Sequence, residues 1–483
     1  MTSDALLVGR LSGAALRMAR YYLHYAIAHR QDWQLLDGEQ FAQIRRGRDT
    51  VSSFQERASG EESARLVVAY LEAMEQYLER RGLWQEELRW TDSALNAART
   101  LRNPALEGRL LNDLGLCHRR MGQRDTAMRL LEESLAIRRR VGSSAGEAVT
   151  LNNLGLVLDD LGRRDDALPY YEAALRLRQQ SGDRAGEAVT LHNLATLHQT
   201  LGQWEVARQY YQHALDIARE VGDTASEAGT LSNLGELSLR LSRFTEAEAT
   251  LSRALALMRE AGDRGNEASV LNNLGLLAKS LGQPRRALAY FEEALALRRK
   301  GEAVAGTEAP LLNNIGTAFQ ALGDWRTALT YFEQARERHR DSGDRDGEAT
   351  ALANIGTVHL GRRSWPEAIS ILRQALKAVE SLGDRDAEAT LLNNLAVAFQ
   401  GLGDLIGAVE HLSKALKLHQ EIGNRSMEGT ILNNLGSLSY RARDLTRARE
   451  YLEAALTIRL ETNDTADAAT ILSNLGTLSS TEG

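Results

Sequence analysis

The chain has 483 residues, of which 43% are apolar and 25% are charged, and its one cysteine is Cys117. A lone cysteine excludes an internal disulfide and a thiolate zinc site, which favours a reducing compartment and predicts a cytoplasmic protein. The net charge of −7 comes from 58 basic and 65 acidic residues that are well mixed, so nucleic acid is not expected as a partner. No apolar run of about 18 residues and no signal-peptide pattern occurs, so no membrane partner is expected.

Residues 1–60 form an N-terminal segment without a repeat. The pattern predicts two helices, at about residues 14–30 and 33–57. Their apolar content is Tyr21, Tyr22, Tyr25, Trp33, Leu35, Leu36 and Phe41. Residues 61–106 are interpreted as a degenerate first repeat, because Arg80-Arg-Gly82 aligns with Met121-Gly122 and because Ala94 and Ala98 continue an apolar helix face.

Residues 107–467 contain nine repeats of 40 residues. One tetrapeptide returns ten times, every 40 residues except for one step of 41, and its last copy lies in a terminal single helix at residues 468–483. A fixed period of this size is typical of a solenoid in which each unit buries its apolar face on its neighbours. The copies are Asn112-Asp-Leu-Gly115, Asn152-Asn-Leu-Gly155, His192-Asn-Leu-Ala195, Ser232-Asn-Leu-Gly235, Asn272-Asn-Leu-Gly275, Asn313-Asn-Ile-Gly316, Ala353-Asn-Ile-Gly356, Asn393-Asn-Leu-Ala396, Asn433-Asn-Leu-Gly436 and Ser473-Asn-Leu-Gly476.

Each repeat is predicted to be a pair of helices. Leucines from Leu151 to Leu161 recur at helical spacing, and Gly162 suits a helix end. A second apolar face runs from Ala167, and Gly182-Asp-Arg184 then supplies a left-handed stop and an N-cap for the next helix.

Prolines and one irregular connection mark departures from the regular pattern. Pro284, Pro310 and Pro366 fall in first turns, where a missing amide hydrogen costs little. Pro169 lies past the first turn, so we expect a bend or a later helix start there. Residues 301–310 lack the Gly-Asp-Arg break and are the candidate for a flexible seam.

The spacing of Leu154-Gly155, Leu158, Gly162, Ala167, Tyr171 and Ala174 resembles the tetratricopeptide repeat, in its 40-residue kinesin-light-chain-like form. This form also occurs in the sensor domains of bacterial STAND-type (NB-ARC/NACHT-like) signalling ATPases. The resemblance implies an all-α fold, a right-handed superhelical solenoid of antiparallel helix pairs. It also implies a concave groove lined by the first helices. The N-terminal segment is similar to the helical region that precedes the repeats in STAND-type proteins.

No constellation for catalysis, cofactor or metal binding stands out. Gly-rich phosphate loops are absent, and the ten histidines lack the i, i+4 pairing of a metal-binding helix. Cys117 and His118 point about 100° apart on a helix, so they do not form a nucleophile and base pair. Tryptophans at the starts of second helices are interpreted as packing anchors between repeats, namely Trp84, Trp204, Trp325 and Trp365. We therefore expect a protein that is not an enzyme and needs no cofactor.

An asparagine recurs at the second tetrapeptide position, where only Asp113 differs. At about 100° per residue, Asn153 points away from the packing face and towards the groove. One hypothesis is that the carboxamides bind the backbone of a peptide ligand. The other is a structural ladder in which each side chain bonds the neighbouring repeat, and both can hold together. The asparagines are Asn153, Asn193, Asn233, Asn273, Asn314, Asn354, Asn394, Asn434 and Asn474.

Other groove positions vary between repeats and are predicted to contact ligand side chains. Arg109 and Arg120 suggest a basic start of the groove, and Arg240 and Lys279 are further candidates. After Lys279 the groove positions are mostly small and hydroxylic, which predicts room for a large partner element such as a helix or a folded domain.

The sequence thus favours a non-catalytic module that binds a protein or peptide in its concave groove. The hypothesis we favour is the ligand-sensing domain of a bacterial STAND-type protein, with an attached or partner ATPase or effector. The alternative is a free-standing scaffold or adaptor that mediates protein–protein interactions. An enzyme with an unrecognised helical site is a third class, for which the sequence offers no residues.

Overall fold

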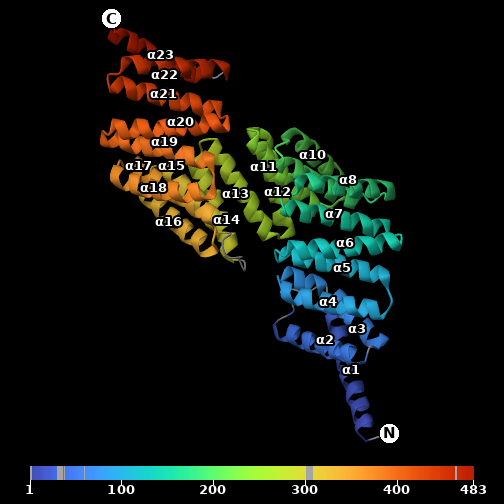
Figure 1. Cartoon of the computed structure of the whole chain (residues 1–483). Coiled ribbons are helices and arrows are strands. Elements are labelled where there is room, and N and C mark those ends of the chain that lie inside the picture. Colours follow the sequence, from blue (N-terminus) through green and yellow to red (C-terminus); the bar gives the residue numbers. More distant parts are fainter. Residues whose placement is uncertain are drawn as a thin grey trace. The chain divides into compact units, whose positions relative to one another are not determined.

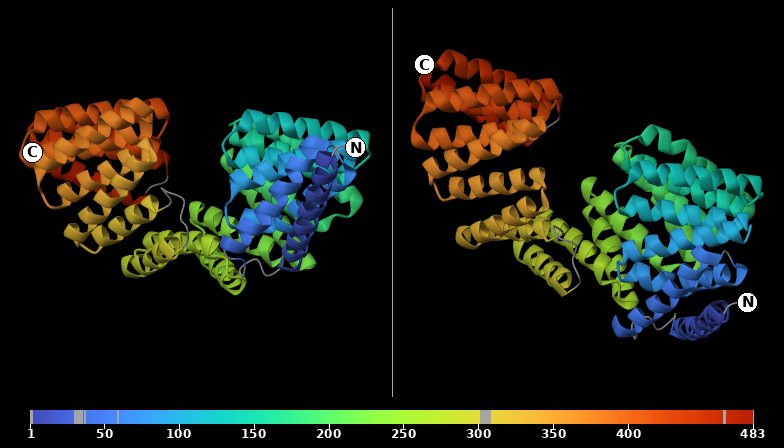
Figure 2. Two further views of the ribbon diagram at one scale, coloured as in Figure 1. Left: turned by 90° about the horizontal axis from the view of Figure 1, so that it is seen from below. Right: turned by 60° about the horizontal axis from the view of Figure 1, so that its bottom comes forward.

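The computed structural model describes residues 3–29, 36, 38–58, 60–300, 308–462 and 465–482. These residues form 23 helices and contain no strand, which confirms the predicted all-α fold. The chain divides into two compact units, Met1–Leu237 and Ser238–Gly483, and in each of them helices are stacked side by side (Figures 1 and 2).

Most helices form antiparallel pairs, as the repeat predicted. The first unit contains α1 (Ser3–His29), α2 (Gly38–Ala58), α3 (Glu61–Arg80), α4 (Trp84–Thr100), α5 (Pro104–Arg120), α6 (Arg124–Arg140), α7 (Ser144–Asp160), α8 (Arg164–Ser181), α9 (Arg184–Thr200), α10 (Trp204–Val221) and most of α11 (Thr224–Arg240). The second unit continues with α12 (Phe244–Ala261), α13 (Arg264–Ser280), α14 (Pro284–Lys300), α15 (Ala309–Ala321), α16 (Trp325–Ser342), α17 (Arg345–Gly361), α18 (Trp365–Leu382), α19 (Arg385–Leu402), α20 (Leu405–Ile422), α21 (Arg425–Arg441), α22 (Leu445–Glu461) and α23 (Thr465–Glu482). From α5 onwards, odd numbers are the first helices of repeats and even numbers the second helices.

The boundary between the two units lies inside α11 and not at the connection 301–310. Residues 301–307 of that predicted seam lie outside the described residues. On either side of them α14 packs against α15, so the stacking of helices continues across the connection.

The N-terminal helices differ from the prediction in their bounds. Helix α1 begins at Ser3 and not near residue 14, and α2 begins at Gly38 and not at 33, while Trp33 and Leu35 lie outside the described residues. The core here is formed by Leu36, Tyr70 and Trp90, whereas Tyr21 is 67% exposed. The hydroxyl of buried Tyr70 donates to the carbonyl oxygen of Ala19 at 2.5 Å, which ties α1 to α3.

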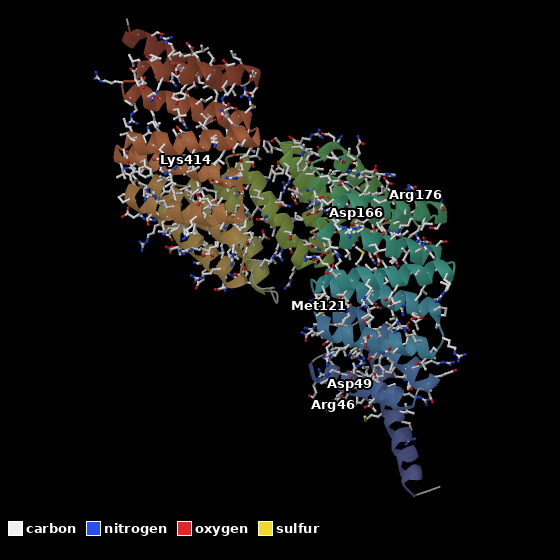
Figure 3. The ribbon with its side chains drawn as sticks, viewed as in Figure 1. Arg46, Asp49, Met121, Asp166, Arg176 and Lys414 are labelled. Atoms are coloured by element: carbon white, nitrogen blue, oxygen red, sulfur yellow. The ribbon has the colours of Figure 1, made fainter. Side chains whose placement is uncertain are left out.

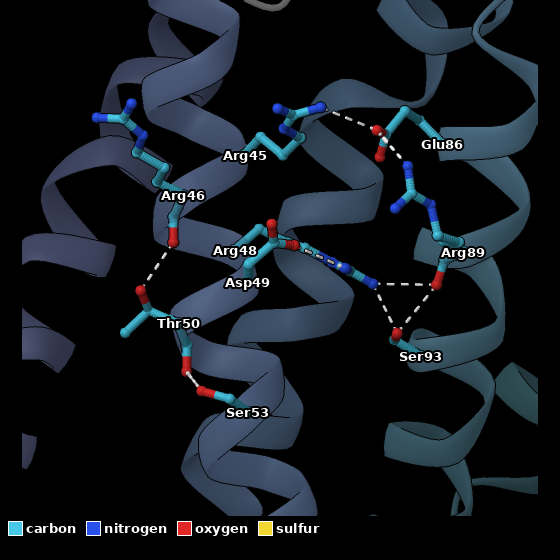
Figure 4. A network of polar contacts seen from close by, with 9 residues as sticks. All are labelled: Arg45, Arg46, Arg48, Asp49, Thr50, Ser53, Glu86, Arg89 and Ser93. Atoms are coloured by element: carbon cyan, nitrogen blue, oxygen red, sulfur yellow. Dashed lines mark hydrogen bonds and ion pairs between the residues drawn. The ribbon is translucent and has the colours of Figure 1, made fainter.

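Polar contacts join α2 to the degenerate repeat (Figure 4). Buried Arg48 donates from Nη2 to the carbonyl oxygen of Arg89 at 3.0 Å and to Ser93 Oγ at 2.6 Å. Arg45 Nη1 lies 3.1 Å from Glu86 Oε1 at the exposed edge of the same contact. The N-terminal segment therefore packs against α3 and is hydrogen-bonded to α4, and α3 in turn packs against α4.

The breaks between repeats take the predicted conformations. Gly182 ends α8 with φ +71°, a left-handed conformation in which glycine carries no steric penalty. Asp183 then caps α9, because its side chain accepts from the amide of Gly186 at 2.9 Å. The expected later helix start at Pro169 is wrong, since α8 already begins at Arg164 and continues through that proline.

A small residue in each first helix lets the second helix approach closely. A Cβ atom added to Gly155 would lie 2.7 Å from the ring of Tyr171, which is itself 1% exposed. The same position is Gly316 against Phe332 and Gly436 against Leu452. The two helices of a repeat therefore pack closely because a large side chain of the second helix lies directly against a glycine of the first helix.

The first helices form the inner side of each stack. Contacts join successive first helices, such as α5 with α7, α7 with α9 and α17 with α19. Among the described residues, successive second helices have no comparable contacts. The second helices carry exposed ion pairs along their own length, such as Arg176 with Glu172 and Lys414 with Glu410. Arg176 and Lys414 are labelled in Figure 3. Within each unit the groove-forming face is consequently that of the first helices.

A valine at Gly155 tests the close helix contact. We expect Gly155→Val to lower the free energy of unfolding by about 2 kcal/mol, because Tyr171 must move from its seat. Gly229→Val is the matched control, because a Cβ atom at Gly229 meets nothing within 4 Å and the equivalent residue is Val149 or Val189 in other repeats. Urea denaturation followed by circular dichroism measures both, and equal stability of the two variants would contradict the packing role.

Candidate functional site

The asparagines of the first helices form a ladder from repeat to repeat. We call the second residue of each tetrapeptide the ladder donor and the first residue the ladder acceptor. In six places the Nδ2 of a ladder donor lies within hydrogen-bond distance of the ladder acceptor in the preceding repeat. The pairs are Asn153 to Asn112 (2.9 Å), Asn193 to Asn152 (2.9 Å), Asn233 to His192 (3.1 Å), Asn314 to Asn272 (2.8 Å), Asn354 to Asn313 (3.5 Å) and Asn474 to Asn433 (3.1 Å).

The ladder uses only part of each donor's hydrogen-bonding capacity. A carboxamide has two N–H groups and an oxygen that can accept two bonds. In Asn193, Asn314, Asn354 and Asn474 one N–H is used, and no described residue donates to the Oδ1. These four side chains are partly exposed, whereas Asn153 is only 7% exposed. The ladder is therefore structural and still leaves polar groups on the first-helix face.

The remaining predicted asparagines have no ladder bond among the described contacts. For Asn394, the acceptor position of the preceding repeat is Ala353, which has no side-chain acceptor. For Asn434, the acceptor position of the preceding repeat is Asn393, whose buried Oδ1 has no hydrogen-bond partner. Asn273 is partly buried in α13. The ladder is thus interrupted in the second unit, because these asparagines lack the bond to the preceding repeat.

His192 replaces an asparagine as a ladder acceptor. Its Nε2 accepts from Asn233, which places the ring proton on Nδ1, 3.1 Å from Thr230 Oγ1. Burial lowers the pKa of His192 to about 4. The neutral ring is therefore the form that fits the ladder.

The start of the groove is not basic, contrary to the prediction. Arg109 Nη2 lies 2.8 Å from Glu72 Oε1, and Arg120 contacts Glu79 at 2.7 Å and Glu87 at 3.2 Å. These carboxylates neutralise the two arginines, and they come from α3 and α4, in which the repeat pattern is degenerate. Further along, Arg240 and Lys279 are exposed near the ends of α11 and α13.

Burial raises the pKa of several carboxyls at the same place. It does so for Glu75, Glu87 and Asp113, and neighbouring arginines oppose the shift in each case. The surface formed by α3, α4 and α5 is consequently a mixed network of charges and not a patch of one sign.

Pockets adjoin the ladder in both units, and two of them combine apolar and polar walls. The first has a volume of about 320 Å³ and is lined by α9 and α11, where Gly229 takes the place of a valine. The second has about 240 Å³ and is lined by Ser437, Tyr440, Arg441, Leu452, Asn474 and Thr477. Both combine apolar walls with a few polar groups, which is the usual character of a subsite for a ligand side chain.

Cys117 and two of the four tryptophans are packing residues, whereas Trp84 and Trp204 are 38% and 36% exposed. Cys117 is 1% exposed, and burial raises the pKa of its thiol, which disfavours the reactive thiolate. The rings of Trp325 and Trp365 lie against Gly361 and Gly401 of the following first helices, as expected for packing anchors between repeats.

No metal-binding group of three or more His, Cys, Asp or Glu side chains occurs among the described residues. None of the helices in the described part of the chain is long and apolar enough to span a membrane.

The sequence matches the tetratricopeptide repeat family over residues 146–220, 226–300, 307–381, 348–421 and 386–461, and a second model of this repeat matches residues 109–141. The chain belongs to the tetratricopeptide repeat family. Repeat proteins of this kind are in general non-catalytic binding modules. No curated protein matches the sequence.

Solved structures with the same fold are similar at low identity. A STAND protein with a tetratricopeptide repeat sensor from Pyrococcus horikoshii has a TM-score of 0.52 and 14% identity, with 80% of this chain and 55% of that chain covered. A Rap protein complexed with competence and sporulation factor has a TM-score of 0.51 and 14% identity, covering 74% and 99%. The protein BtubC from P. vanneervenii has 24% identity over 45% of this chain and 91% of its own, with a TM-score of 0.42.

Alanine substitutions at Asn314 and Asn394 test the ladder. Asn314→Ala removes the bond to Asn272, whereas Asn394→Ala removes no ladder bond and only raises helix propensity. We expect Asn314→Ala to be less stable than Asn394→Ala by about 1 kcal/mol in denaturant unfolding. Indistinguishable free energies of unfolding would contradict a structural ladder.

The neutral His192 predicts an acid-sensitive first unit. Its pKa is near 6.5 when the chain is unfolded and about 4 when folded, so between these values the unfolded chain binds the proton. The stability supplied by neutral His192 is thus complete above pH 6.5 and is lost as the pH falls towards 4. His192→Asn should retain about 2 kcal/mol more of its stability between pH 7 and pH 4.5 than the wild type. Equal losses in both proteins, measured by denaturation at the two pH values, would contradict this assignment.

Proposed function

We propose that the chain is a non-catalytic binding module whose first-helix face takes an extended peptide or protein segment. The observation that carries this proposal is the set of ladder donors that are held in place by one N–H and keep an unbonded Oδ1, namely Asn193, Asn314, Asn354 and Asn474. A row of fixed carboxamides suits a peptide backbone, which offers a donor and an acceptor at each residue. Because the ladder already orients these side chains, little conformational entropy is lost when a ligand binds.

The surroundings of the ladder support a peptide ligand. The face carries small or hydroxylic side chains beside the asparagines, such as Thr357 and Ser437, and the two pockets lie next to it. The carboxamides would bind the backbone of an extended peptide, and the pockets would bind its side chains.

For the wider role, we propose that the module senses its ligand for a STAND-type signalling ATPase in the cytoplasm. The support is the similarity in fold to the sensor-bearing STAND protein and to the Rap protein complexed with a signalling factor. In such a sensor, ligand binding would shift the stack between conformations that an attached ATPase or effector distinguishes.

A peptide library displayed on phage tests the binding face. Peptides selected on the wild-type chain should bind about 100-fold more weakly to a variant with Val397→Arg and Ser437→Arg, because two long charged side chains would occupy the face. The matched control carries Gln374→Arg and Ser413→Arg, which add the same charges to exposed positions of second helices. Equal loss of binding in both variants, or in neither, would contradict the proposal.

Hydrogen exchange with a selected peptide separates a sensor from a scaffold. A sensor predicts altered exchange in repeats beyond those that the peptide contacts, because binding is coupled to a conformational equilibrium. A scaffold predicts protection confined to the contacted repeats, and that result would contradict the sensor role while leaving the binding face intact.

A further inference from the structure

A pocket with a volume of about 440 Å³ lies in the first unit, with α4 and α6 as its walls and α5 at its base. Its floor is apolar, because Leu95, Leu111 and Leu114 are at most 4% exposed and belong to one hydrophobic cluster. The volume is within the usual range of sites for small molecules. No residue of the asparagine ladder lines this pocket, so it is distinct from the peptide-binding face proposed above.

In three other repeats, two stacked aromatic side chains occupy the equivalent place. Tyr210 of α10 stacks on His198 of α9, with ring centroids 5.2 Å apart and an angle of 9° between the ring planes. Tyr210 also packs against the clusters that contain Leu191 and Leu194, the equivalents of two leucines of the pocket floor. The other two stacked pairs are Phe319 with Tyr331 and Phe399 with His411.

Between α5 and α6 the histidine is retained, but the second aromatic ring is not. His118 Nδ1 lies 2.5 Å from Gln123 Oε1, and His198 is bonded in the same way to its own equivalent glutamine. The residue equivalent to Tyr210 is Leu130, which has no ring and lines the pocket together with His118. A ligand with an aromatic ring can therefore form on His118 the stacked contact that Tyr210 forms within the chain.

The charged side chains around the pocket favour a ligand that carries both charges. Two arginines of the walls are already neutralised by carboxylates that do not line the pocket. The pairs are Arg89 with Glu86 at 2.5 Å and Arg99 with Glu107 at 2.9 Å. Asp92, Arg129 and Glu133 also line the pocket, and they form no ion pair with any described residue. An ammonium group and a carboxylate of a ligand can thus pair with these three side chains without breaking an existing contact.

We propose that this pocket binds a free aromatic amino acid. The ring lies on the leucine floor and stacks on His118. The ammonium group pairs with Asp92 or Glu133, and the carboxylate pairs with Arg129. Because the ligand contacts both walls, it joins α4 to α6 and stabilises the folded chain.

Calorimetric titration of the full chain with L-phenylalanine tests the proposal. We expect a dissociation constant on the order of 100 µM, as is usual for a ligand of this size in an open pocket. L-leucine lacks the ring and should bind about 10-fold more weakly. L-phenylalaninamide lacks the carboxylate and N-acetyl-L-phenylalanine lacks the ammonium group, so each should also bind about 10-fold more weakly. These two compounds resemble the aromatic residue at either end of a peptide, and they therefore distinguish a free amino acid from a peptide terminus.

A tyrosine at position 130 fills the pocket with the side chain that other repeats use. Leu130→Tyr should weaken the binding of L-phenylalanine by about 100-fold or more, because its ring takes the place of the ligand on His118. Its stability in urea should equal or exceed that of the wild type, since the stack of Tyr210 on His198 shows that the repeat accepts this residue. Thr250→Tyr is the matched control, because it adds the same ring at the equivalent position of α12 and outside the pocket. It should leave the affinity unchanged.

A second variant tests the charges without altering the packing. Arg129 is exposed on α6, and Arg129→Gln should weaken the binding of L-phenylalanine about 10-fold. The same change should leave the binding of L-phenylalaninamide unaltered, because this compound has no carboxylate to lose its partner.

Binding of L-phenylalanine that is lost in Leu130→Tyr and retained in Thr250→Tyr would support the proposal. No detectable binding at about 10 mM ligand would overturn it. Binding that survives Leu130→Tyr would overturn it too, since the ligand would then lie elsewhere. Equal affinity for L-leucine, or for either blocked amino acid, would also contradict it, because the ring or one of the charges would not be recognised.

Discussion

The repeat architecture depends on the contact between a large side chain of the second helix and a small residue of the first helix. Tyr171 over Gly155 and Phe332 over Gly316 fix how closely the two helices of a repeat approach. This distance decides which leucines are buried and which edge of the first helix is left outside the core.

The asparagine ladder acts on the opposite edge of the first helices. Packing of apolar side chains brings successive first helices together, and the bonds from Asn193 to Asn152 and from Asn314 to Asn272 set their polar edge in register. Asparagine is a poorer helix former than alanine, so its return in nearly every repeat needs a compensating interaction. The ladder bond supplies one where it forms, and the unbonded oxygen is the group that the proposed function assigns to the ligand.

The repeats could be predicted from the sequence because ten copies report the same packing environment, and the capping by Asp183 follows from local chemistry alone. The bounds of the N-terminal helices could not be predicted, since the first 60 residues have no second copy for comparison.

The ladder acceptors were missed because helix angles place Asn153 relative to its own helix and not to the neighbouring helix. The available signal was the pair of adjacent asparagines in the tetrapeptide. The basic groove was wrong because the partners of Arg109 and Arg120 lie on the degenerate repeat.

The double role of the ladder donors is the central claim, and side-chain amide NMR of selectively ¹⁵N-asparagine-labelled protein tests it most directly. Assigned spectra of the free chain and of its complex with a selected peptide would be compared. The account predicts that one N–H of Asn314 and Asn354 exchanges slowly in both states, while the other N–H of each residue shifts when the peptide binds. Side-chain resonances that exchange rapidly and do not respond to the peptide would contradict both roles.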